Sequence, residues 1–63
     1  MRNDIRALRK DKGLRQEDLA RMTGVTRQTI IAVENDRYNP TLELAMKISR
    51  ELGRSVEELF FLD

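Results

Sequence analysis

Apolar residues recur along this chain at the three- and four-residue spacing of amphipathic helices, and glycines or capping residues interrupt the pattern. No stretch alternates apolar and polar residues over a useful length, and no Asn-Gly or Asp-Gly turn occurs, so no strand is expected. We therefore predict an all-α chain. We expect five helices. The first runs from about residue 4 to 12, the second from 15 or 16 to just before 24, and the third from a cap at 26 to about 35–36. The fourth runs from a cap at 41 to just before 53, and the fifth from a cap at 55 through 60.

The interval between the second and third predicted helices has the features of a helix-turn-helix. Two helices that cross steeply over a short turn need a small residue where they touch, here Ala20, and a residue free to turn at the end of the first, here Gly24. Ile30 and Val33, three residues apart, then supply the apolar inner face of the second helix.

Length and composition exclude most other functions. A chain of 63 residues and 7.4 kDa is one small domain, residues 1–63, with little room for a deep pocket. It contains no Cys and no His, so we expect no catalytic residues, no metal and no cofactor, and hence no enzyme. No apolar run approaches the ~20 residues that span a bilayer, which predicts a cytoplasmic protein without membrane contact.

The charge is unevenly distributed, although the whole chain carries only +1. Residues 1–37 hold nine basic and six acidic side chains, and residues 38–63 hold three and five. The first part is therefore the basic one, which suits an anionic partner but also occurs in proteins without one.

Several segments resemble the Cro/C1-type (Xre-family) DNA-binding domains. They are QEDLA at 16–20, GVTRQTI at 24–30, VEN at 33–35, NPTL at 39–42 and SVEELF at 55–60. The resemblance covers nearly the whole chain. It implies a compact five-helix bundle of the lambda-repressor type that docks its third helix in the major groove of double-stranded DNA as a homodimer, and that represses or activates transcription.

Two positions depart from the family pattern. Arg15 stands where the family commonly has Ser or Thr as the N-cap of the second helix, so this helix is expected to fray, although Glu17 and Asp18 partly compensate. Asp36 stands where the family commonly has Gly, so we predict a positive φ at Asn35 or Asp36.

The helical step of ~100° per residue turns one face of the third helix outward when Ile30 and Val33 point inward. The candidate base contacts on or beside that face are Arg27, Gln28, Ile31 and Ala32. The candidate phosphate contacts are Gln16, Thr26, Thr29, Asn35 and Arg37. Two of these have a second interpretation, because Ile31 also fits a scattered apolar surface residue and Thr26 also fits a helix cap.

The family pattern also implies a structural ion pair between Arg9 and Glu34. The remaining basic residues near the first helix are expected to be solvated or to act at long range, and direct phosphate contact by each of them is the alternative. They are Arg2, Arg6, Lys10 and Lys12.

The last residues are too apolar for a solvated tail. By the family pattern Phe60 belongs to the core. Phe61 and Leu62 are additional, and we expect them to form a homodimer interface with Val56 and Met46, bordered by Leu44. Alternatively, they fold back within one chain onto Ile5 and Met1. Two further interpretations stay open: an antitoxin or phage-type immunity regulator with a protein partner, and a protein-interaction module without a DNA role.

Overall fold

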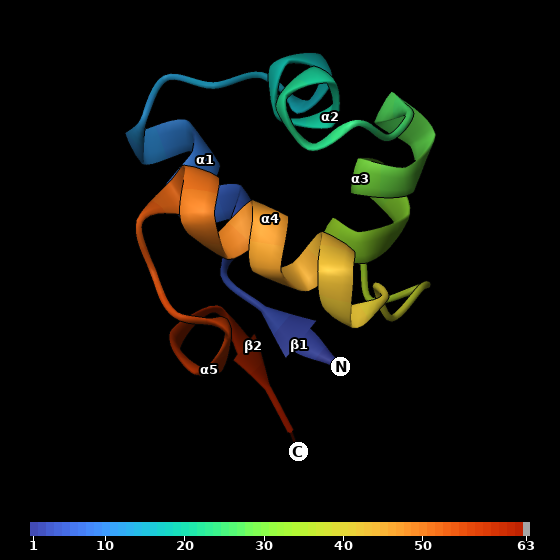
Figure 1. Ribbon diagram of the computed structural model, residues 1–63, viewed down its shortest axis with the longest axis vertical. Helices are drawn as coiled ribbons and strands as arrows, with labels where there is room; N and C mark the ends of the chain where they lie inside the picture. Colours follow the sequence, from blue (N-terminus) through green and yellow to red (C-terminus); the bar gives the residue numbers. More distant parts are fainter. Residues whose placement is uncertain (63) are drawn as a thin grey trace.

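The computed structural model describes residues 1–62, and five helices and two very short strands make up its regular structure (Figure 1). In chain order the elements are β1 (Arg2–Asn3), α1 (Ile5–Asp11), α2 (Gln16–Thr23), α3 (Arg27–Glu34), α4 (Leu42–Leu52), α5 (Val56–Leu59) and β2 (Phe60–Phe61). Each of the five predicted helices is present close to its predicted limits, which confirms the helical fold.

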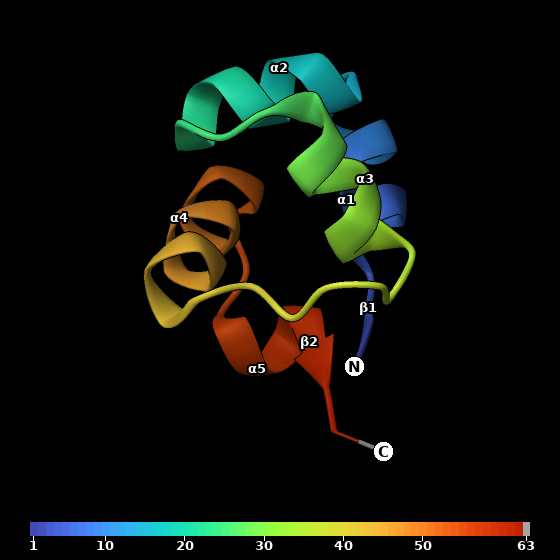
Figure 2. The same cartoon turned by 90° about the vertical axis from the view of Figure 1, so that its right-hand side faces the viewer.

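The prediction that the chain has no strand is wrong. β1 and β2 pair antiparallel, with Arg2 opposite Phe61 and Asn3 opposite Phe60, and they lie side by side at one end of the molecule (Figure 2). Asp4 extends the pairing by donating its N–H to the carbonyl of Leu59 at 3.0 Å. The two-residue strands are too short to show alternation, and they come from opposite ends of the chain, so no local pattern could reveal them.

The helix starts follow from their capping residues. The hydroxyls of Thr26, Thr41 and Ser55 each accept a hydrogen bond from the backbone N–H three residues later, at 3.3, 3.1 and 3.1 Å. Gly24 and Gly53 end α2 and α4 in the left-handed conformation, with φ of 75° and 70°. Asp36 has a φ of 59°, which confirms the positive φ predicted after α3.

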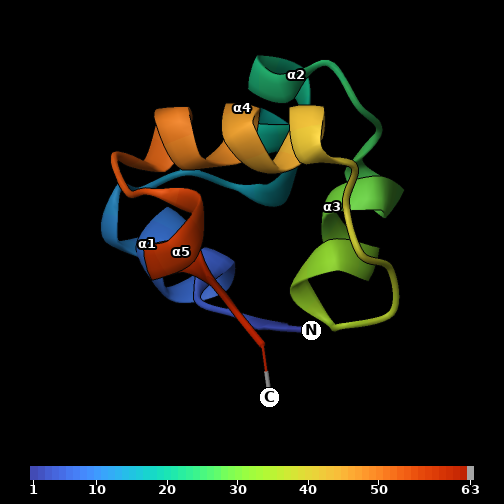
Figure 3. The same cartoon turned by 60° about the horizontal axis from the view of Figure 1, so that its bottom comes forward.

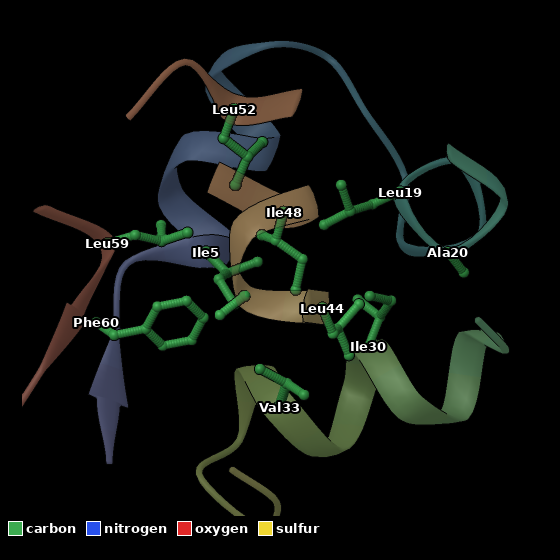
Figure 4. Packing of buried hydrophobic residues seen from close by; sticks show 11 residues of the cluster. Ile5, Leu19, Ala20, Ile30, Val33, Leu44, Ile48, Leu52, Leu59 and Phe60 are labelled. Atoms are coloured by element: carbon green, nitrogen blue, oxygen red, sulfur yellow. The ribbon is translucent and has the colours of Figure 1, made fainter. Parts of the chain in front are cut away.

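A continuous apolar core joins all five helices (Figure 4). It contains Ile5 of α1, Leu19 and Ala20 of α2, Ile30 and Val33 of α3, Leu44, Ala45, Ile48 and Leu52 of α4, and Leu59 and Phe60 at the end of the chain. Helix α4 crosses the middle of the molecule and contacts α1, α2 and α5 (Figure 1). Phe60 is in this core, as predicted, because β2 turns its ring inward beside Ile5.

Candidate nucleic-acid interface

Helices α2 and α3 pack closely against each other and form the predicted helix-turn-helix. Ala20 is buried where they meet, and the N–H of Val25 donates to the carbonyl of Ala20 at 3.0 Å. This bond and the left-handed Gly24 reverse the chain over a short turn. Ile30 and Val33 are buried at 0% and 1% exposure, so the opposite face of α3 is turned outward.

The outward face of α3 is accessible at its start. Arg27 and Gln28 are exposed, and within residues 1–62 neither side chain makes a hydrogen bond or ion pair. Ile31 and Ala32 are only half-buried, so part of each side chain remains on the surface. The first turns of α3 therefore present two polar side chains followed by a small apolar strip.

The five candidate phosphate contacts differ in how far their polar atoms already make hydrogen bonds within the chain. The Thr26 hydroxyl is 3.1 Å from the Thr29 hydroxyl and also caps α3, so its capping role is real. Asn35 follows α3, and its Oδ1 accepts a hydrogen bond from Arg6 Nη2 at 2.7 Å, which leaves its amide N–H₂ available as a donor. Arg37 is exposed after the left-handed Asp36.

The expected ion pair between Arg9 and Glu34 is present and links α1 to the end of α3. Arg9 Nε lies 2.7 Å from Glu34 Oε2, and Arg9 Nη2 lies 3.3 Å from Glu34 Oε1. The two side chains are 8% and 0% exposed. Arg9 also donates from Nη1 to the carbonyl of Leu14 at 2.8 Å, so it fixes the loop that leads into α2.

The Glu34 carboxylate has further partners. Gln16, at the start of α2, donates its amide to Glu34 Oε1 at 3.2 Å, and Arg6 Nε lies 3.5 Å from the same oxygen. Burial alone would raise the pKa of Glu34, but the hydrogen bonds from Arg9 and Gln16 outweigh it, and its pKa lies below the ordinary value. Glu34 therefore holds together residues of α1, α2 and α3.

Arg6 does not have the solvated role expected for it. Its guanidinium contacts both Asn35 and Glu34, although half of the side chain surface is exposed. Arg6 and Arg9 are three residues apart and thus share a face of α1. That spacing could have indicated a common partner, but the partner itself is visible only in three dimensions.

The first turn of α2 is stabilised by a different interaction from the N-cap of the family pattern. An Arg side chain has no acceptor, so Arg15 cannot cap α2, but the Asp18 carboxylate accepts from the backbone N–H of Arg15 at 2.8 Å and from its Nε at 3.2 Å. These bonds lower the pKa of Asp18 to about 2. Half of a capping box and an ion pair therefore stand in for the missing cap at the start of α2.

Of the four residues expected at the dimer interface, Val56 and Leu62 line one groove near the C-terminal end of the described chain, whereas Phe61 and Met46 do not line it. Leu62 is 90% exposed and Met46 is 52% exposed, whereas Val56 and Phe61 are half-buried. Leu44, expected to border this surface, is instead buried in the core, because α4 turns it towards α2 and α3.

Sequence reasoning missed Leu42, which is 72% exposed and lines a mostly apolar groove of about 390 Å³ together with Met1, Pro40, Ala45, Val56, Glu57, Phe60 and Leu62. The alternative of folding back is partly realised: the backbone of Phe61 pairs with Arg2, and Met1 shares the groove with Leu62.

Within residues 1–62, no three His, Cys, Asp or Glu residues are grouped so that they could hold a metal ion. None of the helices described there is long and apolar enough to cross a membrane.

Comparisons with known proteins agree with this geometry. Residues 5–59 match the helix-turn-helix family model. A helix-turn-helix-type transcriptional regulator of Methanothermobacter thermautotrophicus is 58% identical over 64 residues, which cover 100% of this chain and 93% of that protein. The restriction-modification controller protein C.AhdI from Aeromonas hydrophila has a similar structure, with a TM-score of 0.81, 38% identity, and coverage of 89% of this chain and 85% of that one.

A second similar structure is a chain of the complex between SinR protein and SinI protein, with a TM-score of 0.76 and 32% identity over 82% of this chain and 52% of that one. The family comprises transcriptional regulators, which are not enzymes, and this confirms the expectation drawn from the sequence. The chain belongs to the Cro/C1-type (Xre) family of helix-turn-helix transcriptional regulators.

Proposed function

We propose that this regulator binds a palindromic operator in double-stranded DNA as a homodimer, with α3 in the major groove, and that it represses transcription. The observation that carries this proposal is the start of α3, where Arg27 and Gln28 are exposed and unpaired within residues 1–62 while Ile30 and Val33 anchor the helix in the core. A dimer that covers a promoter excludes polymerase without further contacts, which favours repression. We regard residues 1–63 as one DNA-binding domain.

Each base contact is proposed from the chemistry of its side chain. Arg27 can pair in a bidentate manner with guanine O6 and N7, and Gln28 with adenine N6 and N7. The half-buried Ile31 suits contact with a thymine methyl group, and Ala32 permits close approach of the helix to the base edges.

The phosphate contacts would fix α3 in the groove without reading the sequence. Thr26 and Thr29 lie near the start of α3, and Gln16 lies at the start of α2, where unpaired N–H groups and the helix dipole favour an anion. Asn35 and Arg37 would contact the backbone beyond the other end of α3.

The homodimer is proposed to form through Leu62, Phe61, Val56 and Met46. An isologous contact brings the same patch of both chains together, so one apolar surface serves both sides. α3 and α5 lie on different sides of the molecule (Figures 1 and 3), so a contact at the α5 end leaves α3 free. Two copies of α3 would then read half-sites about 34 Å apart on one face of the duplex.

Substitution of Leu62 tests the dimer. Leu62→Glu changes a 90% exposed side chain, so we expect the variant to fold. We expect it to be monomeric by light scattering and to bind operator DNA with lower affinity than the wild type. Met22→Glu is the matched control, because Met22 is an exposed apolar residue of α2 outside the proposed interface. A wild-type monomer on its operator, or a dimer mass unchanged in Leu62→Glu, would contradict the interface.

Selection of binding sites from a random duplex pool tests sequence recognition. We expect enrichment of a palindrome whose half-sites are about one helical turn apart. Salt-sensitive retention without enrichment would reduce the function to phosphate binding alone.

A second candidate function, as an antitoxin or interaction module, is favoured by the apolar groove beside Leu42 and Leu62. A partner protein would then occupy the surface proposed for the second copy, and one of the similar structures is that of a complex between two proteins, SinR and SinI. Absence of any DNA retention in the selection would favour this candidate.

A further inference from the structure

A cleft of about 500 Å³ lies between α1 and the starts of α2 and α3, and its walls are strongly basic. Five of the lining residues are cationic: Arg6, Arg9 and Lys10 of α1, Arg15 before α2, and Arg27 of α3. Glu17 is the only acidic residue in the lining, and it is paired with Arg15 at 3.3 Å.

Most of these cations already have a partner within the chain. Arg9 is neutralised by the buried Glu34, Arg6 contacts Glu34 and Asn35, and Arg15 contacts Glu17 and Asp18. Lys10 and Arg27 are different, because within residues 1–62 neither makes a hydrogen bond or an ion pair. Two uncompensated charges, one from α1 and one from α3, therefore border the same cleft.

We propose that this cleft holds a phosphate of the DNA backbone and that Lys10, which lies outside the helix-turn-helix, is one of its ligands. The inference rests on the proposed function: Gln16 and Arg27 line the cleft as well, so a DNA strand bound by them would run past its opening. The Lys10 side chain is exposed on the last turn of α1, and its ammonium group offers three donors to phosphate oxygens. Lys10 thus adds a backbone contact to those made from α2 and α3.

The test is the salt dependence of binding to a duplex of arbitrary sequence. Removal of one phosphate ligand makes the slope of log K against log salt shallower by ~0.9, which corresponds to roughly eightfold weaker binding per chain in 0.1 M salt. We expect this change for Lys10→Gln, and we expect Lys10→Arg to retain the wild-type slope. Circular dichroism at the assay temperature checks that both variants are folded.

Lys12→Gln is the matched control. It removes the same charge two residues away, but the Lys12 ammonium lies beside Gly53, 3.9 Å from the position that a Cβ would take there, and does not line the cleft. Equal slopes for Lys10→Gln and Lys12→Gln would overturn the assignment of the cleft while leaving DNA binding intact. A wild-type protein with no salt-dependent DNA binding would refute the proposed function itself.

Inorganic phosphate in solution is the other possible source of the phosphate group that the cleft would bind. Replacing chloride by inorganic phosphate at constant ionic strength should weaken wild-type and Lys10→Gln binding equally, because a backbone site needs a strand positioned by α2 and α3. Selective competition against the wild type would instead identify the cleft as a site for free phosphate.

Discussion

Substitution of Glu34 by Ala tests the network that joins α1, α2 and α3. The carboxylate has no exposed surface, and it accepts from Arg9 Nε at 2.7 Å, from Arg9 Nη2 at 3.3 Å and from Gln16 Nε2 at 3.2 Å. Its removal leaves the guanidinium of Arg9, itself 8% exposed, without a counter-charge. Breaking a buried pair on one side costs about 3–5 kcal/mol.

That destabilisation is large for this chain. At ~0.05–0.15 kcal/mol per residue, the free energy of unfolding of a domain of this length is about 3–9 kcal/mol. Glu34→Ala should therefore be marginally folded at 25 °C, whereas Glu34→Gln, which keeps an acceptor oxygen for Arg9, should be destabilised less. Urea unfolding followed by circular dichroism at 222 nm measures both.

The double variant Arg9→Met/Glu34→Ala measures how much of the destabilisation comes from leaving one buried charge without its partner. It should be more stable than the two single variants predict when their destabilisations are added, because it leaves no unpaired charge inside. A destabilisation below about 1 kcal/mol in Glu34→Ala would refute the reasoning. So would a fully stable Glu34→Ala that no longer binds DNA, since Glu34 would then act at the interface and not in the fold.

Three further predictions concern single side chains. The pKa of Asp18 is lowered from 3.8 to about 2 in the folded protein, so ionised Asp18 stabilises the fold fully above pH 3.8, and this stabilisation is lost as the pH falls towards 2. In acid unfolding, the stability difference between wild type and Asp18→Asn should therefore shrink over that range. A constant difference would contradict this explanation. Asp36 has a φ of 59°, so Asp36→Ala should be about 1 kcal/mol less stable than Asp36→Gly by thermal unfolding, and equal stabilities would contradict this explanation. Gln28→Ala should weaken operator binding by about 1–3 kcal/mol without changing the salt slope, measured by fluorescence anisotropy, and a reduced slope would make Gln28 a phosphate contact.

The helices could be predicted because their signals are local. Thr26, Thr41 and Ser55 precede apolar repeats, and Gly24 and Gly53 follow them, so caps and stops agree with periodicity at each boundary. The positive φ at Asp36 was predicted from the family resemblance, because Asp36 stands where the family commonly has Gly. The burial of Ile30 and Val33 followed from the spacing of apolar residues alone.

Other features depend on how distant segments meet. The pairing of Arg2 with Phe61 joins the two ends of the chain, and no local pattern encodes it. Leu42 and Leu44 differ in burial only because α4 rotates Leu44 towards the other helices, and hydropathy does not distinguish them. The contact from Arg6 to Asn35 likewise requires the end of α3 to lie beside α1.

The central claim is that two copies of α3 enter the major groove on one face of the duplex, and methylation interference on the selected operator tests it most directly. A methyl group at guanine N7 lies in the major groove, where Arg27 is proposed to bind. We expect methylation to block binding at guanines in two half-sites about 10 base pairs apart, in symmetric positions. Interference confined to one half-site, or binding insensitive to N7 methylation, would contradict the account.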